Sequence, residues 1–215
     1  MKNKIPRILS ILIISILLVL SSSASAMPVQ AAAKSRVVSL DETEIHHLEF
    51  IREEEKLARD VYLVLYDHWG LEIFRSIAES EQRHMDAMAL LLAKYGLADP
   101  VTDDSIGAFN DPYIDSLYDW LSGWGLTSLD DALLVGAFIE EYDILDIWLA
   151  YEETDESHIQ DVYQSLYEGS YNHLASFVYC YEQFYGDYEI QLLTPDEFDA
   201  VLCFDTDARQ THGDK

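Results

Sequence analysis

Apolar residues recur every three or four positions along most of this chain, the spacing that places them on one face of an α-helix. Serine, threonine, asparagine or aspartate stands where most of these runs begin, and glycine often stands where they end. The pattern predicts an all-α protein with four long helices, which run from Ser39 or Asp41 to Trp69, from Leu71 to Tyr95, from Thr127 or Ser128 to about Tyr151, and from about Asp155 to just before Gly186. A shorter extra helix is expected between the second and third of these, capped by Asn110 or Asp111 and ending at Gly123 or Gly125.

The apolar stripe of the second long helix is interrupted at its centre by Glu81 and His84. The two residues are three positions apart, so the carboxylate and the imidazole point to the same side of the helix. Burying such groups without partners would cost about 2 to 7 kcal/mol for a neutral polar group and more for a charge. A metal ion is the partner that this pair predicts.

The other three long helices carry the same kind of interruption near their middles. An antiparallel four-helix bundle would bring these mid-helix positions into one layer. The sequence therefore predicts a bundle of this kind, with metal ligands in its central layer. The predicted ligands are Glu55 on the first helix, Glu81 and His84 on the second, Glu140 and Asp143 on the third, and His173 on the fourth.

Several of these assignments have a competing interpretation. Glu54 lies on the neighbouring face of the first helix, and Glu55 is favoured because it falls on the apolar stripe. Asp143 is either a ligand or a residue that supports one. Tyr62 and Ser170 share the stripes of the ligands and are expected beside the metal rather than on it.

Carboxylates combined with two imidazoles suit iron or manganese, and zinc also fits such a set. Di-iron carboxylate bundles use one Glu from each of two helices and a Glu-x-x-His from each of the other two. This chain departs from that pattern at Ser170, where the fourth helix would supply its Glu, and Asp143 is the residue that could replace it. We expect two iron ions, with a single ion as the alternative.

The run from Glu55 to Tyr62 resembles the first-helix Glu-x-x-Ala-Arg-x-x-Tyr motif of the rubrerythrins. The blocks Arg52 to Tyr62, Glu79 to Asp86 and Gly169 to Leu174 also resemble an uncharacterised ferritin-like family of prokaryotic proteins. These resemblances imply a ferritin-like bundle. They imply an activity much less directly, because one fold hosts many functions.

Two classes of function follow from this site. The first is an oxidoreductase whose di-iron centre reacts with dioxygen or peroxide, as in the rubrerythrins. The chain has no pair of Cys-x-x-Cys motifs for an attached electron carrier, so such an enzyme would need an external electron donor. The second is a non-catalytic metal-binding or structural module of the cell envelope.

The amino terminus has the features of an export signal. Three basic residues precede an apolar run, and Ala24-Ser25-Ala26 forms a cleavage site. We expect a signal peptide over residues 1–26, with an uncleaved anchor as the alternative. The expected organisation after it is a flexible leader over 27–39, the bundle over 40–186, an extension packed on the bundle over 187–203, and a disordered tail over 204–215.

The chain is strongly acidic, with 40 Asp and Glu against 13 Lys and Arg and a formal net charge of −27. Such a surface repels nucleic acids and anionic membranes, so neither is an expected partner, whereas metal ions are. A solvated acidic coat that keeps the protein soluble is the alternative explanation for the charge as a whole.

Two cysteines, Cys180 and Cys203, stand near the end of the fourth helix and in the extension. An exported protein with an even number of cysteines can form a disulfide, so a bridge between them is expected. Two unpaired thiols are the alternative.

Overall fold

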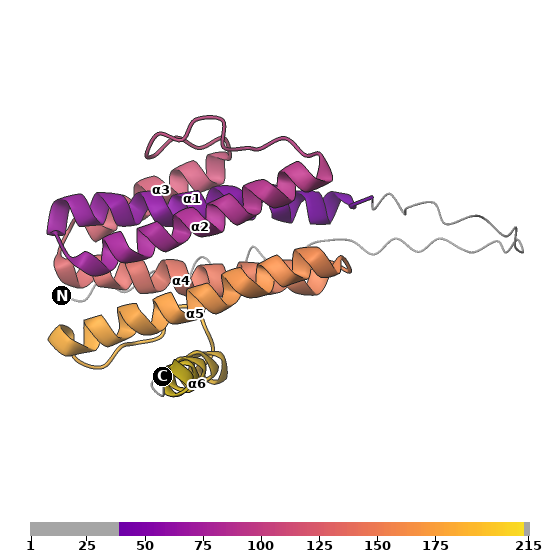
Figure 1. The fold of residues 1–215 in the computed structure, drawn as a ribbon. Coiled ribbons are helices and arrows are strands. Elements are labelled where there is room, and N and C mark those ends of the chain that lie inside the picture. The colour runs from indigo at the N-terminus through magenta and orange to yellow at the C-terminus, as the bar shows by residue number, and fades with distance from the viewer. Residues whose placement is uncertain (1–38, 213–215) are drawn as a thin grey trace, which may run out of the picture. The chain divides into compact units, whose positions relative to one another are not determined.

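The computed structural model describes residues 39–212, which form six α-helices and no strand (Figure 1). The helices are α1 (Glu42–Trp69), α2 (Glu72–Tyr95), α3 (Pro112–Gly125), α4 (Leu129–Glu153), α5 (Ser157–Tyr185) and α6 (Pro195–His212). The all-α prediction is confirmed, and the first five helices agree with the predicted ones. The expected signal peptide and almost all of the leader lie outside the described residues. Among the residues described, no helix is both long and apolar enough to cross a membrane.

The ends of the helices follow from local chemistry. Asp41 and Glu44 form a capping box at the start of α1, in which each side chain accepts the other residue's backbone N–H at 2.9 Å. Asp111 caps α3 ahead of Pro112, and Ser128 caps α4. Gly70 ends α1 with a φ of 66°, a left-handed conformation that favours glycine, so α2 begins almost at once.

The four long helices pack against one another in a closed order, with α1 beside α2 and α4, and α5 beside α2 and α4 (Figure 1). Their interior contains two apolar clusters. One includes Leu57, Phe74, Leu133 and Phe177, and the other includes Leu48, Met88, Ile147 and Ile159. Helices α1 and α5 run from the cluster that includes Leu48 to the cluster that includes Leu57, and α2 and α4 run in the opposite direction. Neighbouring long helices therefore run antiparallel, and a polar layer lies between the two clusters.

Helix α1 is covered on every side at its centre, where all residues from 51 to 62 are buried. Glu53 accepts the N–H groups of Asn110 and Asp111 at 2.6 and 2.8 Å and so fixes the start of α3. Lys56 is fully buried, pairs with Asp60 and donates to the carbonyl of Ser105 at 2.8 Å. The loop before α3 and α3 itself thus cover the side of α1 that the long helices leave open.

The segment after α5 is held against α4 by hydrogen bonds, most of them to the side chain of Glu141. The buried carboxylate of Glu141 accepts the backbone N–H of Leu193 at 2.9 Å and the hydroxyl of Tyr188 at 2.7 Å, and it also accepts the N–H of Leu192. This contact carries the chain to α6, which packs on α5.

Helix α6 extends past residue 203, the predicted end of the packed extension, and continues to His212 within the stretch predicted as a disordered tail. Its start has a local cause, because the hydroxyl of Thr194 and the carboxylate of Glu197 cap one another's backbone N–H groups. Phe198, Val201 and Phe204 follow at a spacing of three and face the core, with Val201 fully buried.

Cys180 is half-buried and Cys203 is exposed, and both are free thiols in the structure. The bridge expected between them is not formed.

Candidate metal centre

Two groups of potential metal ligands lie side by side in the polar layer between the apolar clusters. The first consists of Glu55, Glu81 and His84, and the second of Glu81, Glu140 and His173. In each group the three ligand atoms lie within 4.8 Å of one another. The four long helices each contribute, so side chains that are far apart in the sequence converge on one place.

Glu81 belongs to both groups because its two oxygens face different histidines. Its Oε2 lies 2.7 Å from Nδ1 of His84, and its Oε1 lies 2.7 Å from Nδ1 of His173. The two imidazole rings are stacked with their centroids 5.5 Å apart. Each histidine also approaches a second carboxylate, His84 that of Glu55 at 3.2 Å and His173 that of Glu140 at 3.3 Å.

The donor atoms are close together, yet most of them are not satisfied by hydrogen bonds. Both oxygens of Glu81, Oε1 of Glu55, Oε2 of Glu140 and Nδ1 of His173 are buried and have no hydrogen-bond partner. Ligands that sit about 2.0 to 2.2 Å from a shared ion lie about 3 to 3.5 Å from one another. The contacts of His84 with Glu55 and of His173 with Glu140, at 3.2 and 3.3 Å, fall in this range. Each of the two groups could therefore hold a metal ion.

The charges of this layer are strongly coupled. Burial lowers the pKa of His84, but the carboxylates of Glu55 and Glu81 outweigh burial and raise that pKa to about 11. Burial likewise opposes the effect of Glu81 and Glu140 on His173, whose pKa is raised to about 10. Burial raises the pKa of Glu55 to about 7, whereas the two histidines hold the pKa of Glu81 well below its usual range despite burial. Without metal, the imidazoles therefore carry the positive charge that balances the carboxylates.

The remaining residues predicted for the site lie around these two groups. The hydroxyl of Tyr62 donates to Oε1 of Glu140 at 2.6 Å, and Ser170 donates to the carbonyl of Leu166 in its own helix at 3.3 Å. Asp143 is buried with both oxygens unpartnered but is not part of either ligand group. Burial and the nearby charge of Glu54 raise the pKa of Asp143 well above the usual range.

Glu54 and Asp146 form a second pair of acidic side chains beside the site, and the sequence did not predict this pair. Glu54 is 1 % exposed and both of its oxygens lack hydrogen-bond partners. Burial, together with the nearby charges of Asp146 and Glu55, raises its pKa well above the usual range. The sequence already offered Glu54 as an alternative ligand to Glu55. Asp146 lies off the apolar stripe of α4, so nothing in the sequence connected it with the site.

Gly169 is a further residue that sequence reasoning did not connect with the ligands. A Cβ atom at this position would lie 2.6 Å from Nε2 of His84. The absence of a side chain on α5 therefore leaves the space that the imidazole from α2 occupies.

Comparisons with known proteins place this chain in a family. Residues 44–204 match the family described as an uncharacterised protein domain, DUF2202. The chain is 45% identical over 168 residues to the uncharacterised protein MJ0754 of Methanocaldococcus jannaschii, an alignment that covers 78% of this chain and 91% of that protein. The crystal structure of hypothetical protein MJ0754 from Methanococcus jannaschii superimposes with a TM-score of 0.75 at 44% identity, covering 83% of this chain and 98% of that one. The chain therefore belongs to the DUF2202 family.

Proposed function

We propose that this protein is an exported metal-binding protein that holds two iron ions between its four long helices. The observation that carries the proposal is the shared carboxylate of Glu81, which faces His84 with one oxygen and His173 with the other, each at 2.7 Å. Glu55 and Glu140 complete one ligand group each. Manganese or zinc would suit the same donors.

We further propose that the fold is a four-helix bundle of the ferritin type. The antiparallel order of α1, α2, α4 and α5 and the polar layer between two apolar clusters support it. Ferritin-like di-iron proteins place their ligands in such a layer, on side chains that project inward from all four helices.

A pair of iron ions in this layer would supply the redox chemistry needed to reduce dioxygen or peroxide. The chain's own residues would bind the ions and orient the ligand side chains. Glu81 holds the two positions together, and Tyr62 fixes the carboxylate of Glu140 through its 2.6 Å hydrogen bond. Burial of Glu55, Glu81 and Glu140, each at most 1 % exposed, keeps water from competing for the donors. Electrons would come from an external donor, since the chain's only two cysteines cannot form a second metal site of the rubredoxin kind.

One observation favours a second candidate, a non-catalytic metal-binding or structural module. Ser170 occupies the place where a further carboxylate would complete the di-iron pattern, and its hydroxyl bonds to its own helix instead of turning toward the site. Asp143 is the residue that could offset this loss, but it stands outside both ligand groups. A chain with five ligands could hold one tightly bound ion and a weaker second one.

The export of the protein rests on the amino-terminal sequence, and the acidic surface supports metal ions rather than nucleic acids as partners. A secreted or envelope location follows if the signal is cleaved after Ala26. Mass spectrometry of the mature chain from the native host tests this step independently of the metal site.

Metal analysis of the mature domain, purified with and without air, tests the function. Two irons per chain together with an oxygen-dependent change in the optical spectrum would support the oxidoreductase. Zero or one redox-inert metal would support the second candidate. Glu81→Gln should remove both ions, because both ligand groups use this carboxylate. Glu79→Gln is the matched control, since Glu79 lies on the same helix with its exposed carboxylate paired to Arg75.

A further inference from the structure

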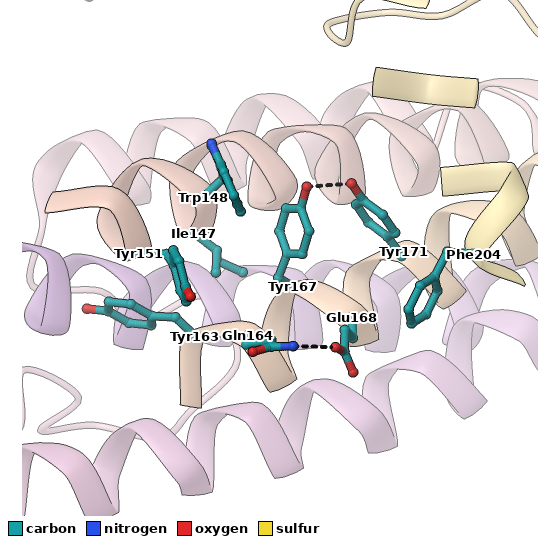
Figure 2. A pocket seen from close by; sticks show the side chains of 9 residues that line it. All are labelled: Ile147, Trp148, Tyr151, Tyr163, Gln164, Tyr167, Glu168, Tyr171 and Phe204. Atoms are coloured by element: carbon teal, nitrogen blue, oxygen red, sulfur yellow. Dashed lines mark hydrogen bonds between the residues drawn. The ribbon is translucent and has the colours of Figure 1, made fainter. Parts of the chain in front are cut away.

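A cavity of about 320 Å³ lies between α4, α5 and α6, and none of its lining residues belongs to the candidate metal centre (Figure 2). Figure 2 shows that its walls are mostly aromatic. The rings are those of Trp148 and Tyr151 from α4, Tyr163, Tyr167 and Tyr171 from α5, and Phe204 from α6.

Five of these rings, all but that of Tyr163, contact one another in a continuous row. Trp148 stacks on Tyr151 and lies against Tyr167, each with a centroid distance of 5.5 Å. Tyr167 lies 4.4 Å from Tyr171, and their hydroxyls are hydrogen-bonded to each other. Tyr171 meets the edge of Phe204 at 5.6 Å. The contacts fix the faces of several rings at once, so the cavity is shaped before any ligand arrives.

Among the described residues that line this cavity and the hollow beside it, every charged side chain is acidic. Glu168 is the one charged residue that lines it, and Nε2 of Gln164 holds the Glu168 carboxylate in place at 2.9 Å. Asp196 and Glu197 line an adjoining hollow that shares Trp148, Tyr167 and Tyr171 with the cavity. Lysine, arginine and histidine are absent from the residues that line either space.

Aromatic faces and a carboxylate together select one class of ligand. The faces of tryptophan and tyrosine attract cations through their electron-rich rings, and cages of such rings bind quaternary ammonium groups. A carboxylate at the rim adds charge attraction, and an anionic ligand would be repelled by Glu168. We propose that this cavity binds a small organic cation with a quaternary ammonium group on an apolar frame, at a site separate from the metal centre.

The test uses the full-length mature protein and choline as the probe. Its neutral control is 3,3-dimethylbutan-1-ol, which has the same shape with carbon in place of the charged nitrogen. Isothermal titration calorimetry reports binding, and so does the intrinsic fluorescence of the four tryptophans, to which the 48% exposed Trp148 contributes. The affinity for choline should be at least about five times that for the alcohol, which is the range that cation–π contacts provide.

Two variants and one matched control locate the site. Trp148→Leu and Glu168→Gln should each weaken choline binding by about fivefold or more, while metal content stays unchanged. Trp120→Leu is the control, because Trp120 is exposed to a similar extent, 42%, but lies on α3 against Trp124. Circular dichroism of each variant confirms that it is folded. Equal binding of choline and the alcohol, no binding of either, or undiminished binding in Trp148→Leu would each overturn the proposal.

Discussion

Gly169 on α5 and His84 on α2 are complementary in shape, since a Cβ at Gly169 would lie 2.6 Å from Nε2 of the imidazole. The other ring nitrogen of His84, Nδ1, faces Glu81 and Glu55. The ring is thus held between a carboxylate pair on one side and the backbone of α5 on the other. The position of the His84 ring therefore depends in part on the missing side chain of Gly169.

Gly169→Ala should crowd the imidazole of His84 against the carboxylates of Glu81 and Glu55 and force it out of its present position. Metal affinity should fall by about 10- to 100-fold, the usual effect of disturbing a residue that orients a ligand. The fold should survive, because a side-chain ring can move where a backbone could not. Competition with a chromogenic chelator measures the affinity. Gly123→Ala is the matched control, since a Cβ there meets nothing within 4 Å, and it should leave metal binding unchanged.

Glu55 and Glu54 are adjacent and both buried, yet they should respond differently to loss of charge. Glu55→Gln should reduce the metal content from two ions to about one per chain, because only Glu55 belongs to a ligand group. Glu54→Gln should keep both ions and should not lower stability, since burial already favours the neutral form of this carboxyl and an amide is neutral and of similar size. Elemental analysis and urea unfolding of both variants check this, and equal metal loss would show that Glu54 and Glu55 both contribute to the site.

Metal binding should release protons, and affinity should rise with pH from 6 to 9. The pKa values of His84 and His173, about 11 and about 10, mean that both imidazoles are protonated near pH 7 in the metal-free protein and must lose their protons to bind an ion. Calorimetry in two buffers of different ionisation enthalpy counts the protons. A buffer-independent enthalpy would contradict the expected exchange.

The same pKa values predict how the metal-free fold responds to base. Both histidines have a folded pKa above the ordinary value of 6.5, so their contribution to stability is fully present below that value. It should disappear as the pH rises through about 10 and 11. Urea unfolding of the metal-free protein between pH 7 and 11 measures this loss, and His173→Gln should make the curve flatter.

Asp60→Ala should destabilise the protein by about 3 to 5 kcal/mol, because it leaves Lys56 as an uncompensated charge with no exposed surface. Asp60 also accepts the N–H of Gly107 at 3.0 Å, so the loop before α3 should loosen as well. Asp104→Ala is the control. Its side chain is 69% exposed and pairs with Arg59, so its loss should cost about 1 kcal/mol or less. Similar urea midpoints for the two variants would show that the buried pair contributes little.

The helices and the polar layer could be predicted because their signals are local and periodic. The capping residues Asp41 and Ser128, and Gly70 as a stop, mark the helix ends within the sequence itself. Glu81 and His84 stand out because apolar residues surround them at helical spacing. Each of these inferences needs only residues within a few turns of one helix.

The features that could not be predicted depend largely on contacts between segments that are distant in the sequence. Gly169 matters only because His84 arrives from another helix. Lys56 lies away from the predicted apolar stripe of α1 and looks solvated until the loop before α3 covers it. The start of α6 depends on the capping pair Thr194 and Glu197, and the apolar face that follows is short, so this helix has a weaker signal in the sequence than the four long ones.

The enclosure of α1 has a consequence for how the protein opens. Backbone amides exchange with solvent through local opening where a helix has a free face, and through global unfolding where it has none. Residues 51 to 62 have no exposed side, and their charged side chains Glu53, Glu55 and Lys56 each tie α1 to a different part of the chain. The amide hydrogens of this stretch should be among the slowest to exchange in the protein, and their rate would report the free energy of unfolding of the whole domain.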